Sequence, residues 1–221
     1  ANLQARLCRQ LISRMFAALA DPVVYAAVAG LFGLLIGSFL NVVIYRLPVM
    51  MERQWAAECA EFRNEPAPVF ESLTLAKPRS RCQNCGHQIT FIENIPVVSW
   101  IFLRGQCSGC GKRISVRYPF VELATGCLFA FAAYRLGFGP ASLGAMGFIA
   151  ALTALTWIDL DTQLLPDDVT LPLLWAGLLF NAFGTYTDLK SAVFGAIAGY
   201  LALWTVYWGF KLATGKDGMG Y

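Results

Sequence analysis

Residues 23–45 read VVYAAVAGLFGLLIGSFLNVVIY, a continuous run without a charged side chain. About 20 apolar residues are enough for an α-helix to cross the roughly 30 Å hydrocarbon core of a bilayer. Arg46 and Pro48 follow at once and are expected to close this first span. The stretch therefore predicts a transmembrane helix and a protein whose solvent is largely lipid.

The composition of the whole chain agrees with this prediction. Its 221 residues are 57% hydrophobic and 14% charged, whereas ordinary soluble domains are roughly 45–50% apolar and about 25% charged. The net charge is only +3, and the sequence contains no dense stripe of lysine and arginine. Nucleic acid is therefore not an expected partner.

Four further apolar stretches follow, at residues 119–136, 141–158, 169–186 and 189–210. Long apolar runs without alternation predict helices, because only helices and closed barrels satisfy their backbone groups in lipid. In the last run, Gly195 and Gly199 have the small-xxx-small spacing that lets helices approach closely. The predicted fold is an all-α polytopic membrane protein, a bundle of transmembrane helices with a small cytosolic module.

The two ends and the loops complete the predicted layout. Residues 1–22 have leucines at an i+4 spacing, which indicates an amphipathic helix at the membrane surface. Residues 46–118 form the polar module and hold ten of the 17 basic residues. The positive-inside rule places this module in the cytosol, together with the residues around Asp159 and the tail at 211–221. Three arginines near the N-terminus oppose this orientation, which places that end outside.

Four of the seven cysteines lie in the polar module as two pairs, Cys82-x-x-Cys85 and Cys107-x-x-Cys110. Each pair can form a tight turn that presents two thiolates to one ion, and four thiolates complete a tetrahedral structural zinc site. The alternatives are two disulfides or four idle thiols, and a cytosolic location argues against disulfides. His87 is expected to be an exposed residue of the turn rather than a ligand. Three other cysteines lack such spacing and are expected to be plain buried thiols, Cys8, Cys59 and Cys127.

Gly86 and Gly111 follow the two cysteine pairs. A turn of this kind often needs a backbone with positive φ just after the second cysteine. We therefore expect both glycines to adopt that conformation.

Four of the seven aspartates fall within ten residues. Asp159 lies where an apolar helix is expected to meet the cytosolic face, so partial desolvation would raise the pKa of its carboxyl group. Acids at such positions are functional candidates by default, although Asp159 could equally mark a helix end. Asp167 and Asp168 follow a proline and are expected to cap the next helix. The role of Asp161 stays open.

Two carboxylates held close together share a proton, so that one acts as a base on water while the other protonates the substrate carbonyl. Asp159 would need such a partner on the same face of the membrane. The only downstream aspartate on the expected cytosolic side is Asp217.

Five stretches resemble the bacterial type IV prepilin peptidases, which are bifunctional leader peptidases and N-methyltransferases. They are residues 37–48 (GSFLNVVIYRLP), the two cysteine pairs, residues 93–100 (ENIPVVSW), residues 117–122 (RYPFVE) and residues 159–167. They occur in the order that the family shows.

The resemblance implies an aspartyl peptidase of the bacterial inner membrane. Such an enzyme removes the leader of type IV prepilins and type II secretion pseudopilins after a glycine, and then methylates the new N-terminal amine with S-adenosylmethionine. Its first catalytic aspartate corresponds to Asp159. The second belongs to a Gly-x-Gly-Asp motif that matches Gly218 and Gly220, so the resemblance expects Gly-Asp just beyond Tyr221. On this view the chain ends within its active-site motif, and Asp217 is not the catalytic partner.

The resemblance is less direct for methyl transfer. The family has a Gly-Lys pair before the third cysteine that is associated with methylation, whereas this chain has Gly105 and Gln106. The methyltransferase candidates are Glu93, Asn94, Gly105 and Glu122. No Gly-x-Gly-x-x-Gly element supports a Rossmann-type site. Asn41, in the first span, could be a ligand or a contact between helices.

Two other functional classes are compatible with parts of the pattern. A zinc-stabilised membrane scaffold would use the acids only as helix caps. A proton-coupled transporter would use the aspartates as a relay, but it would be expected to have acids near the mid-plane and an internal repeat.

Overall fold

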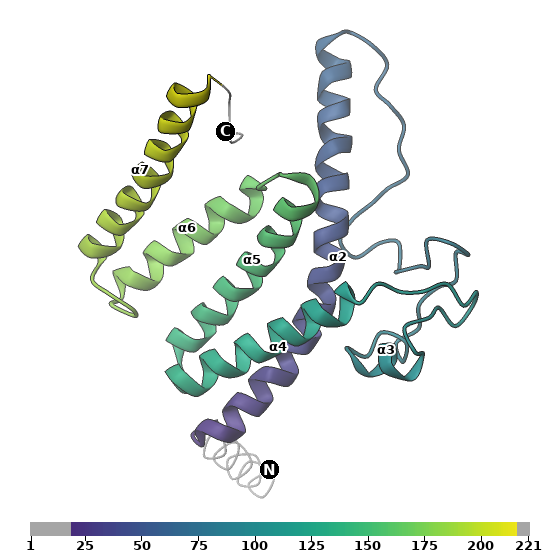
Figure 1. Ribbon diagram of the computed structural model, residues 1–221, viewed down its shortest axis with the longest axis horizontal. Coiled ribbons are helices and arrows are strands. Elements are labelled where there is room, and N and C mark those ends of the chain that lie inside the picture. The colour runs from purple at the N-terminus through teal and green to yellow at the C-terminus, as the bar shows by residue number, and fades with distance from the viewer. Residues whose placement is uncertain (1–18, 216–221) are drawn as a thin grey trace, which may run out of the picture. The chain divides into compact units, whose positions relative to one another are not determined.

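The structure is a computed structural model that describes residues 19–215. It contains six named helices and no extended strand within that range (Figure 1). The chain divides into two compact units, with the boundary between Thr170 and Leu171. The predicted N-terminal amphipathic segment lies almost entirely outside the described residues, as do Cys8, Asp217, Gly218 and Gly220.

Helix α2 spans Pro22–Phe62 and begins the first unit. Asp21 caps it, because its carboxylate accepts hydrogen bonds from the backbone N–H groups of Val23 and Val24 at 2.8 and 3.1 Å, and Pro22 suits the first helical position. The helix does not end at Pro48 as the sequence predicted. It continues for four more turns, so the first part of the polar module is a helix continuous with the first span.

Tertiary contacts offset the local cost of Pro48, which inside a helix is about 3 kcal/mol. Pro48 itself is buried. Two residues earlier, the buried guanidinium of Arg46 donates to the carbonyl oxygens of Thr74 and Pro78, both at 2.7 Å. Arg46 therefore ties the loop that follows α2 to the side of the helix.

Two further long helices complete the first unit. Helix α4 spans Arg117–Leu136 and helix α5 spans Pro140–Thr162, and both pack against α2 and against each other. Their shared core consists of two clusters of apolar side chains: Leu40, Val43, Ile44, Val121, Ala154 and Ile158 in one, and Tyr25, Ala29, Phe129, Ala133 and Met146 in the other.

Small residues allow α2 and α4 to approach closely. A Cβ atom added at Gly37 would lie 2.7 Å from the Cα atom of Glu122, and one added at Gly33 would lie 2.9 Å from the Cα atom of Gly126. Close approach through small residues is the usual means of helix association in lipid. The sequence pointed to Gly195 and Gly199, where an added Cβ atom would meet no atom within 4 Å outside its own helix turn in the described part of the chain.

The substitution Gly37→Leu is expected to separate α2 from α4, because its side chain would meet the backbone of Glu122. We expect a loss of about 1–3 kcal/mol in unfolding free energy, the usual cost of overpacking. Unfolding of the purified protein in detergent measures this. Gly147→Leu in α5 is the matched control, since no atom lies within 4 Å of the position of its Cβ. Equal stability of the two variants would contradict the close approach.

The second unit contains most of helix α6, Asp167–Ala182, and all of helix α7, Leu189–Thr214. Four helices in the described residues are long and apolar enough to cross a membrane: α2, α4, α5 and α7. Helix α6 is not among them. Its 16 residues extend about 24 Å, so this helix is shorter than the span predicted at residues 169–186. Asp167 and Asp168 lie in its first turn, where negative charge suits the helix dipole.

Candidate functional site

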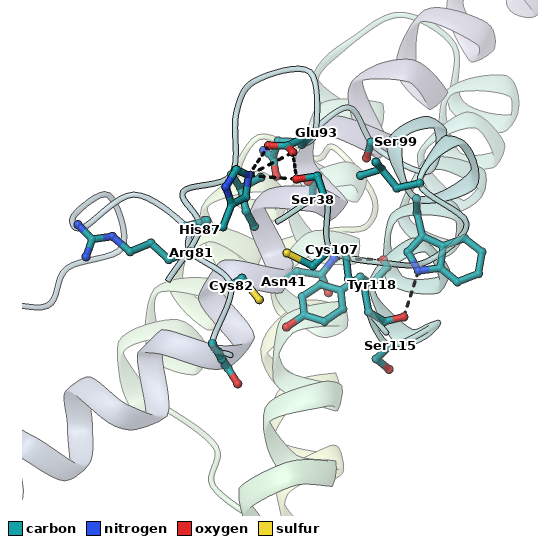
Figure 2. Close-up of a pocket in the computed structure, with 18 of the residues that line it drawn as sticks. Ser38, Asn41, Arg81, Cys82, His87, Glu93, Ser99, Cys107, Ser115 and Tyr118 are labelled. Carbon is teal, nitrogen blue, oxygen red and sulfur yellow. Dashed lines mark hydrogen bonds and ion pairs between the residues drawn. The ribbon is translucent and has the colours of Figure 1, made fainter. Parts of the chain in front are cut away.

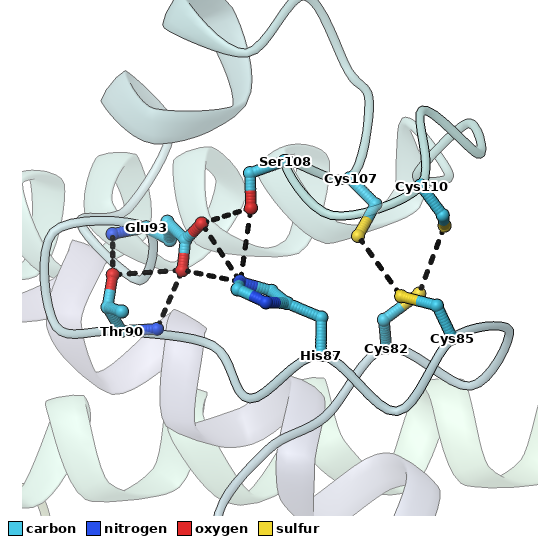
Figure 3. A network of polar contacts seen from close by, with 8 residues as sticks. All are labelled: Cys82, Cys85, His87, Thr90, Glu93, Cys107, Ser108 and Cys110. Carbon is cyan, nitrogen blue, oxygen red and sulfur yellow. Dashed lines mark hydrogen bonds and ion pairs between the residues drawn. The ribbon is translucent and has the colours of Figure 1, made fainter.

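The two cysteine pairs form matching turns in the loop between α2 and α4. In each turn the N–H of the following glycine donates to the carbonyl oxygen of the first cysteine at 2.9 Å, from Gly86 to Cys82 and from Gly111 to Cys107. Both glycines have positive φ, of 73° and 68°, as the sequence predicted. The turns bring four thiols together (Figure 3).

The spacing of the four sulfur atoms suits a metal ion. All four lie within 4.8 Å of one another. The Sγ atoms of Cys82 and Cys110 are 3.9 Å apart, and those of Cys85 and Cys107 are 4.0 Å apart. A tetrahedral ion with metal–sulfur bonds of about 2.3 Å places its sulfur ligands about 3.8 Å apart, whereas a disulfide needs about 2.05 Å. The cluster could therefore hold a metal with these four cysteines as ligands.

The other described cysteines, Cys59 and Cys127, are free and exposed. The sequence predicted that both would be buried. Each lies on a helix side that no other described part of the chain covers, which the lack of a sequence pattern could not reveal.

A polar network joins the two turns (Figure 3). The carboxylate of Glu93 accepts hydrogen bonds from the hydroxyl of Ser108 and from the N–H and hydroxyl of Thr90, the last two at 2.8 and 2.9 Å. These donors, Ser108 first, lower the pKa of Glu93 to about 2, so its carboxylate is ionised at neutral pH. The Nε2 atom of His87 lies 3.2 Å from the same carboxylate. Glu93 and His87 thus link the first turn to the second, and the metal cluster of the described residues contains no histidine.

The loop is also fixed to the membrane helices. The carboxylate of Glu122, buried on α4, accepts a hydrogen bond from the N–H of Val97 at 2.7 Å. Val97 has φ of 61°, a costly conformation for a β-branched residue that persists only where surrounding contacts impose it. On α2, the buried side chain of Asn41 donates to the carbonyl oxygen of Tyr118 at 3.1 Å. Asn41 is therefore a contact between helices.

A cavity of about 490 Å³ lies between the loop and the two helices (Figure 2). Ser38, Asn41 and Tyr45 of α2 line one side, Tyr118 and Glu122 of α4 another, and the loop closes the rest with residues that include Glu93, Asn94 and Trp100. Cavities that bind small molecules usually measure about 300–1,000 Å³ and combine apolar walls with a few polar groups. This cavity has that size and that lining.

Gly105, one of the methyltransferase candidates, packs against Trp100, which lines this cavity. A Cβ atom at Gly105 would lie 2.8 Å from the indole ring, and its φ is 66°. The indole N–H donates to the carbonyl oxygen of Ile114 at 3.2 Å. Gly105 therefore lets Trp100 lie flat against the backbone, and the cavity brings together the regions of Glu93, Asn94, Gly105 and Glu122.

The two aspartates at the end of α5 have different surroundings. Asp161 is bound by Arg117, the first residue of α4, whose Nη1 donates to Oδ1 at 2.8 Å and whose Nη2 lies 2.7 Å from Oδ2. The same guanidinium lies over the ring of Trp157, 4.4 Å from its centroid. Asp159 is exposed, and its side chain has no hydrogen bond or ion pair within residues 19–215.

Residues two positions apart on an α-helix point in directions that differ by roughly 200°. Because Asp161 faces Arg117 of α4, Asp159 points away from α4. No other described element of the first unit covers Asp159. Of the two carboxylates, that of Asp161 is held by an ion pair, whereas that of Asp159 has no such contact in residues 19–215.

The comparisons with known proteins cover nearly the whole chain. Residues 31–136 match the family described as "Bacterial Peptidase A24 N-terminal domain", and residues 146–221 match the one described as "Type IV leader peptidase family". The chain belongs to the type IV leader peptidase family. The resemblance found in the sequence motifs is therefore confirmed. No solved structure matches the chain.

Several relatives in this family are similar over most of their length, and all carry the name "Prepilin leader peptidase/N-methyltransferase". The protein from Stutzerimonas stutzeri is 52% identical over 203 residues, which are 91% of this chain and 70% of that protein. The one from Aeromonas salmonicida (strain A449) is 53% identical over 203 residues, 90% of this chain and 70% of its own length. The one from Pseudomonas aeruginosa is 51% identical over 202 residues, which are 90% of this chain and 69% of that protein.

Within this leader peptidase family member, sequence reasoning missed the residues that act through distant contacts. Arg117 was quoted only as part of a motif, and its ion pair spans 44 positions. Arg46 was taken as the end of a span, whereas it holds the loop at Thr74 and Pro78. A basic residue next to an apolar span was the available signal, but it does not tell which distant group the residue binds.

Reversing the charges of Arg117 and Asp161 tests their pairing. We expect Arg117→Asp or Asp161→Arg alone to cost up to about 1 kcal/mol of unfolding free energy, because both groups are partly exposed. The double variant should recover part of this loss, measured as a coupling energy in detergent. The pair Arg117→Asp with Asp168→Arg is the control and should recover nothing. A zero coupling for the first pair would show that the contact has no energetic importance.

Proposed function

We propose that this protein is a membrane-embedded aspartyl endopeptidase that removes the leader of type IV prepilins and type II secretion pseudopilins, and that it N-methylates the new N-terminus. Membership of the family along the chain supports this, together with the free carboxylate of Asp159 at the end of an apolar helix. We place the enzyme in the bacterial inner membrane, with the cysteine module and Asp159 on the cytosolic side. The ten basic residues of the module support that orientation.

In the proposed cleavage, Asp159 is one carboxyl group of a pair. The second is the aspartate expected after Gly218 and Gly220 in the Gly-x-Gly-Asp motif. The ionised carboxylate takes a proton from water while the neutral one protonates the scissile carbonyl oxygen, and the water oxygen bonds to the carbonyl carbon. The carbon–nitrogen bond of the tetrahedral intermediate then breaks: the amine nitrogen receives the proton held by the first carboxyl group, and one hydroxyl of the intermediate returns its proton to the second carboxylate, which restores the starting pair. Two nearby carboxylates can share one proton in this way because both cannot ionise easily together.

We assign zinc to the four cysteines, Cys82, Cys85, Cys107 and Cys110. The sulfur spacing and the soft thiolate ligands support this assignment. Four protein ligands leave no open position for water or substrate, so the ion has a structural role. When bound, it would hold the two turns together, while the contact of Val97 with Glu122 fixes the loop beside α4.

We assign the methyl donor, S-adenosylmethionine, to the cavity of about 490 Å³. When bound, it supplies an electrophilic methyl group: the amine lone pair bonds to the methyl carbon, the carbon–sulfur electrons pass to sulfur, and the amine loses a proton. Asn94 and Tyr118 offer polar groups without a side-chain hydrogen bond in the described structure, and Trp100 offers a wall. Glu122 supplies a carboxylate that favours a positively charged amine or ligand.

Binding of S-adenosylhomocysteine, the unreactive product, tests the cavity separately from catalysis. We expect Asn94→Ala to weaken its Kd about tenfold, the equivalent of one lost hydrogen bond of about 1.4 kcal/mol. Gln88→Ala is the control, because Gln88 is exposed on the same module and does not line the cavity. Isothermal titration of the purified protein in detergent gives both values. Unchanged affinity in both Asn94→Ala and Trp100→Ala, with methylation of pilin intact in the parent enzyme, would place the donor elsewhere.

The peptidase assignment is tested on the substrate side. Prepilin with its glycine before the cleavage site replaced by valine should not be processed, whereas the unaltered prepilin should lose its leader. Processing is followed by gel mobility of the pilin. Equal processing of both prepilins would contradict the proposed specificity.

A further inference from the structure

The loop between the two cysteine pairs carries large apolar side chains that face away from the protein. The exposed fractions are 84% for Phe91, 77% for Ile92, 61% for Ile101 and 82% for Phe102. Residues 91–102 include helix α3, Val98–Phe102, and we call them the insertion segment. Clustered large apolar side chains at a surface usually mark an interaction site.

The insertion segment lies beside the membrane-spanning helices rather than beyond their ends. The N–H of Val97 binds the carboxylate of Glu122 at 2.7 Å, and Glu122 is five residues into α4 from Arg117. At a rise of 1.5 Å per residue, Glu122 is about 7.5 Å along the helix from its first charged residue. Figure 1 shows α3 near the beginning of α4.

The position of Glu122 alongside helix α2 also places the insertion segment beside the membrane-spanning part of the protein. Glu122 lies against Gly37, where an added Cβ would be 2.7 Å from its Cα atom. Gly37 is nine residues before Arg46, the first charged residue after the apolar span, and that separation corresponds to about 13 Å along the helix. Val97 is therefore on the membrane side of the charged residues that end both spans.

The charges next to the insertion segment suit a phospholipid surface. Arg79 lies over the ring of Phe91, 5.0 Å from its centroid, and Arg104 follows the segment and is exposed. The one acid within the segment is Glu93, whose carboxylate is bound by Ser108 and Thr90. Apolar residues flanked by arginines are typical of segments that lie about 5–10 Å deep at the headgroup boundary and attract anionic lipids.

We propose that the insertion segment is embedded in the bilayer leaflet at the beginning of α4, where Phe91, Ile92, Ile101 and Phe102 contact lipid directly. The lipid-facing surface of α4 continues into it through the contact of Val97 with Glu122. The cavity shares the same walls, because Trp100 of the segment and Ser38 of α2 both line it. The insertion segment therefore brings the cavity to the membrane boundary, independently of which reaction the protein catalyses.

Photo-crosslinking in a native-like bilayer tests the insertion. The photoreactive residue p-benzoylphenylalanine replaces Phe102 or Phe91 in the full protein, reconstituted in vesicles of phosphatidylethanolamine and phosphatidylglycerol. Leu31, exposed on the first span, is the lipid-facing reference, and Val69, 98% exposed in the loop after α2, is the aqueous reference. Mass spectrometry counts phospholipid adducts, and a full metal content shows that each variant is folded.

We expect adduct yields at Phe102 and Phe91 to lie within about threefold of the yield at Leu31 and at least about tenfold above that at Val69, because acyl chains surround an inserted segment. Yields at both positions as low as at Val69, with Leu31 labelled normally, would overturn the proposal. A lipid adduct at Phe102 but not at Phe91 would restrict the insertion to α3 and overturn it for the rest of the segment.

Discussion

Replacing Asp159 with asparagine is expected to reduce prepilin cleavage by about 10²–10⁴-fold, the usual contribution of a positioned general acid or base. Asparagine keeps the size of the side chain but can neither accept the proton of water nor share one with a second carboxyl group. Since Asp159 has no structural partner in the described residues, the substitution should not disturb the fold or the metal content. Initial rates of leader removal by the full enzyme in detergent measure the effect.

The same variant should still methylate a pilin from which the leader has already been removed, because the cavity to which we assign the methyl donor is lined by α2, α4 and the loop, and not by α5. Asp168→Asn in the first turn of α6 is the matched control and should cleave normally. Normal cleavage by Asp159→Asn would remove this residue from the mechanism. Loss of both activities with an intact fold would show that the two sites overlap.

Replacing Cys82 with serine is expected to reduce the metal content from about one ion per chain toward zero, because a tetrahedral site with three thiolates loses much of its affinity for zinc. Metal binding in small modules is worth about 10–16 kcal/mol and is coupled to folding. The two turns have few apolar contacts to replace it, and only Cys107 among the four ligands is buried. The loop should therefore unfold, and the methyl-donor cavity should be lost with it.

Elemental analysis and limited proteolysis of the purified protein measure both effects. Cys59→Ser is the control and should retain its metal, because Cys59 lies on α2 outside the cluster. Cys82→His offers a replacement ligand and should recover part of the metal content. Full zinc occupancy in Cys82→Ser would show that the four-thiolate assignment is wrong.

The metal cluster could be predicted from the sequence because its geometry is local. Two short turns with glycine in the required position bring each pair together, and only the meeting of the two turns depends on distant contacts. The all-helical membrane fold was predictable for a similar reason, since the length and polarity of a run such as residues 23–45 decide whether it can cross a bilayer.

Features that depend on tertiary packing could not be predicted. Proline normally favours the end of a helix, yet α2 continues through Pro48 because Arg46 and the packed loop stabilise it. In the first unit the close approach uses Gly33 and Gly37, whereas the sequence pointed to Gly195 and Gly199, which have the same spacing. Spacing describes one helix and does not identify the helix that packs against it.

The different surroundings of the two aspartates of α5 needed the structure. The sequence singled out Asp159 and left the role of Asp161 open. Arg117 binds Asp161, which leaves Asp159 without an ion pair in the described residues. Arg117 is 44 positions from Asp161 and 42 from Asp159, so no local sequence pattern shows which of the two it binds. Of the methyltransferase candidates, Glu93 is largely occupied by Ser108 and Thr90, so Asn94 and Glu122 become the stronger candidates for contact with a ligand.

One protein is expected both to remove the leader and to methylate the amine that cleavage creates. The most direct measurement is the intact mass of a prepilin after incubation with the full, metal-loaded enzyme and S-adenosylmethionine. The proposed function predicts a pilin that has lost its leader and gained one methyl group on its N-terminal amine. A prepilin of unchanged mass, after incubation with folded enzyme in lipid, would contradict it.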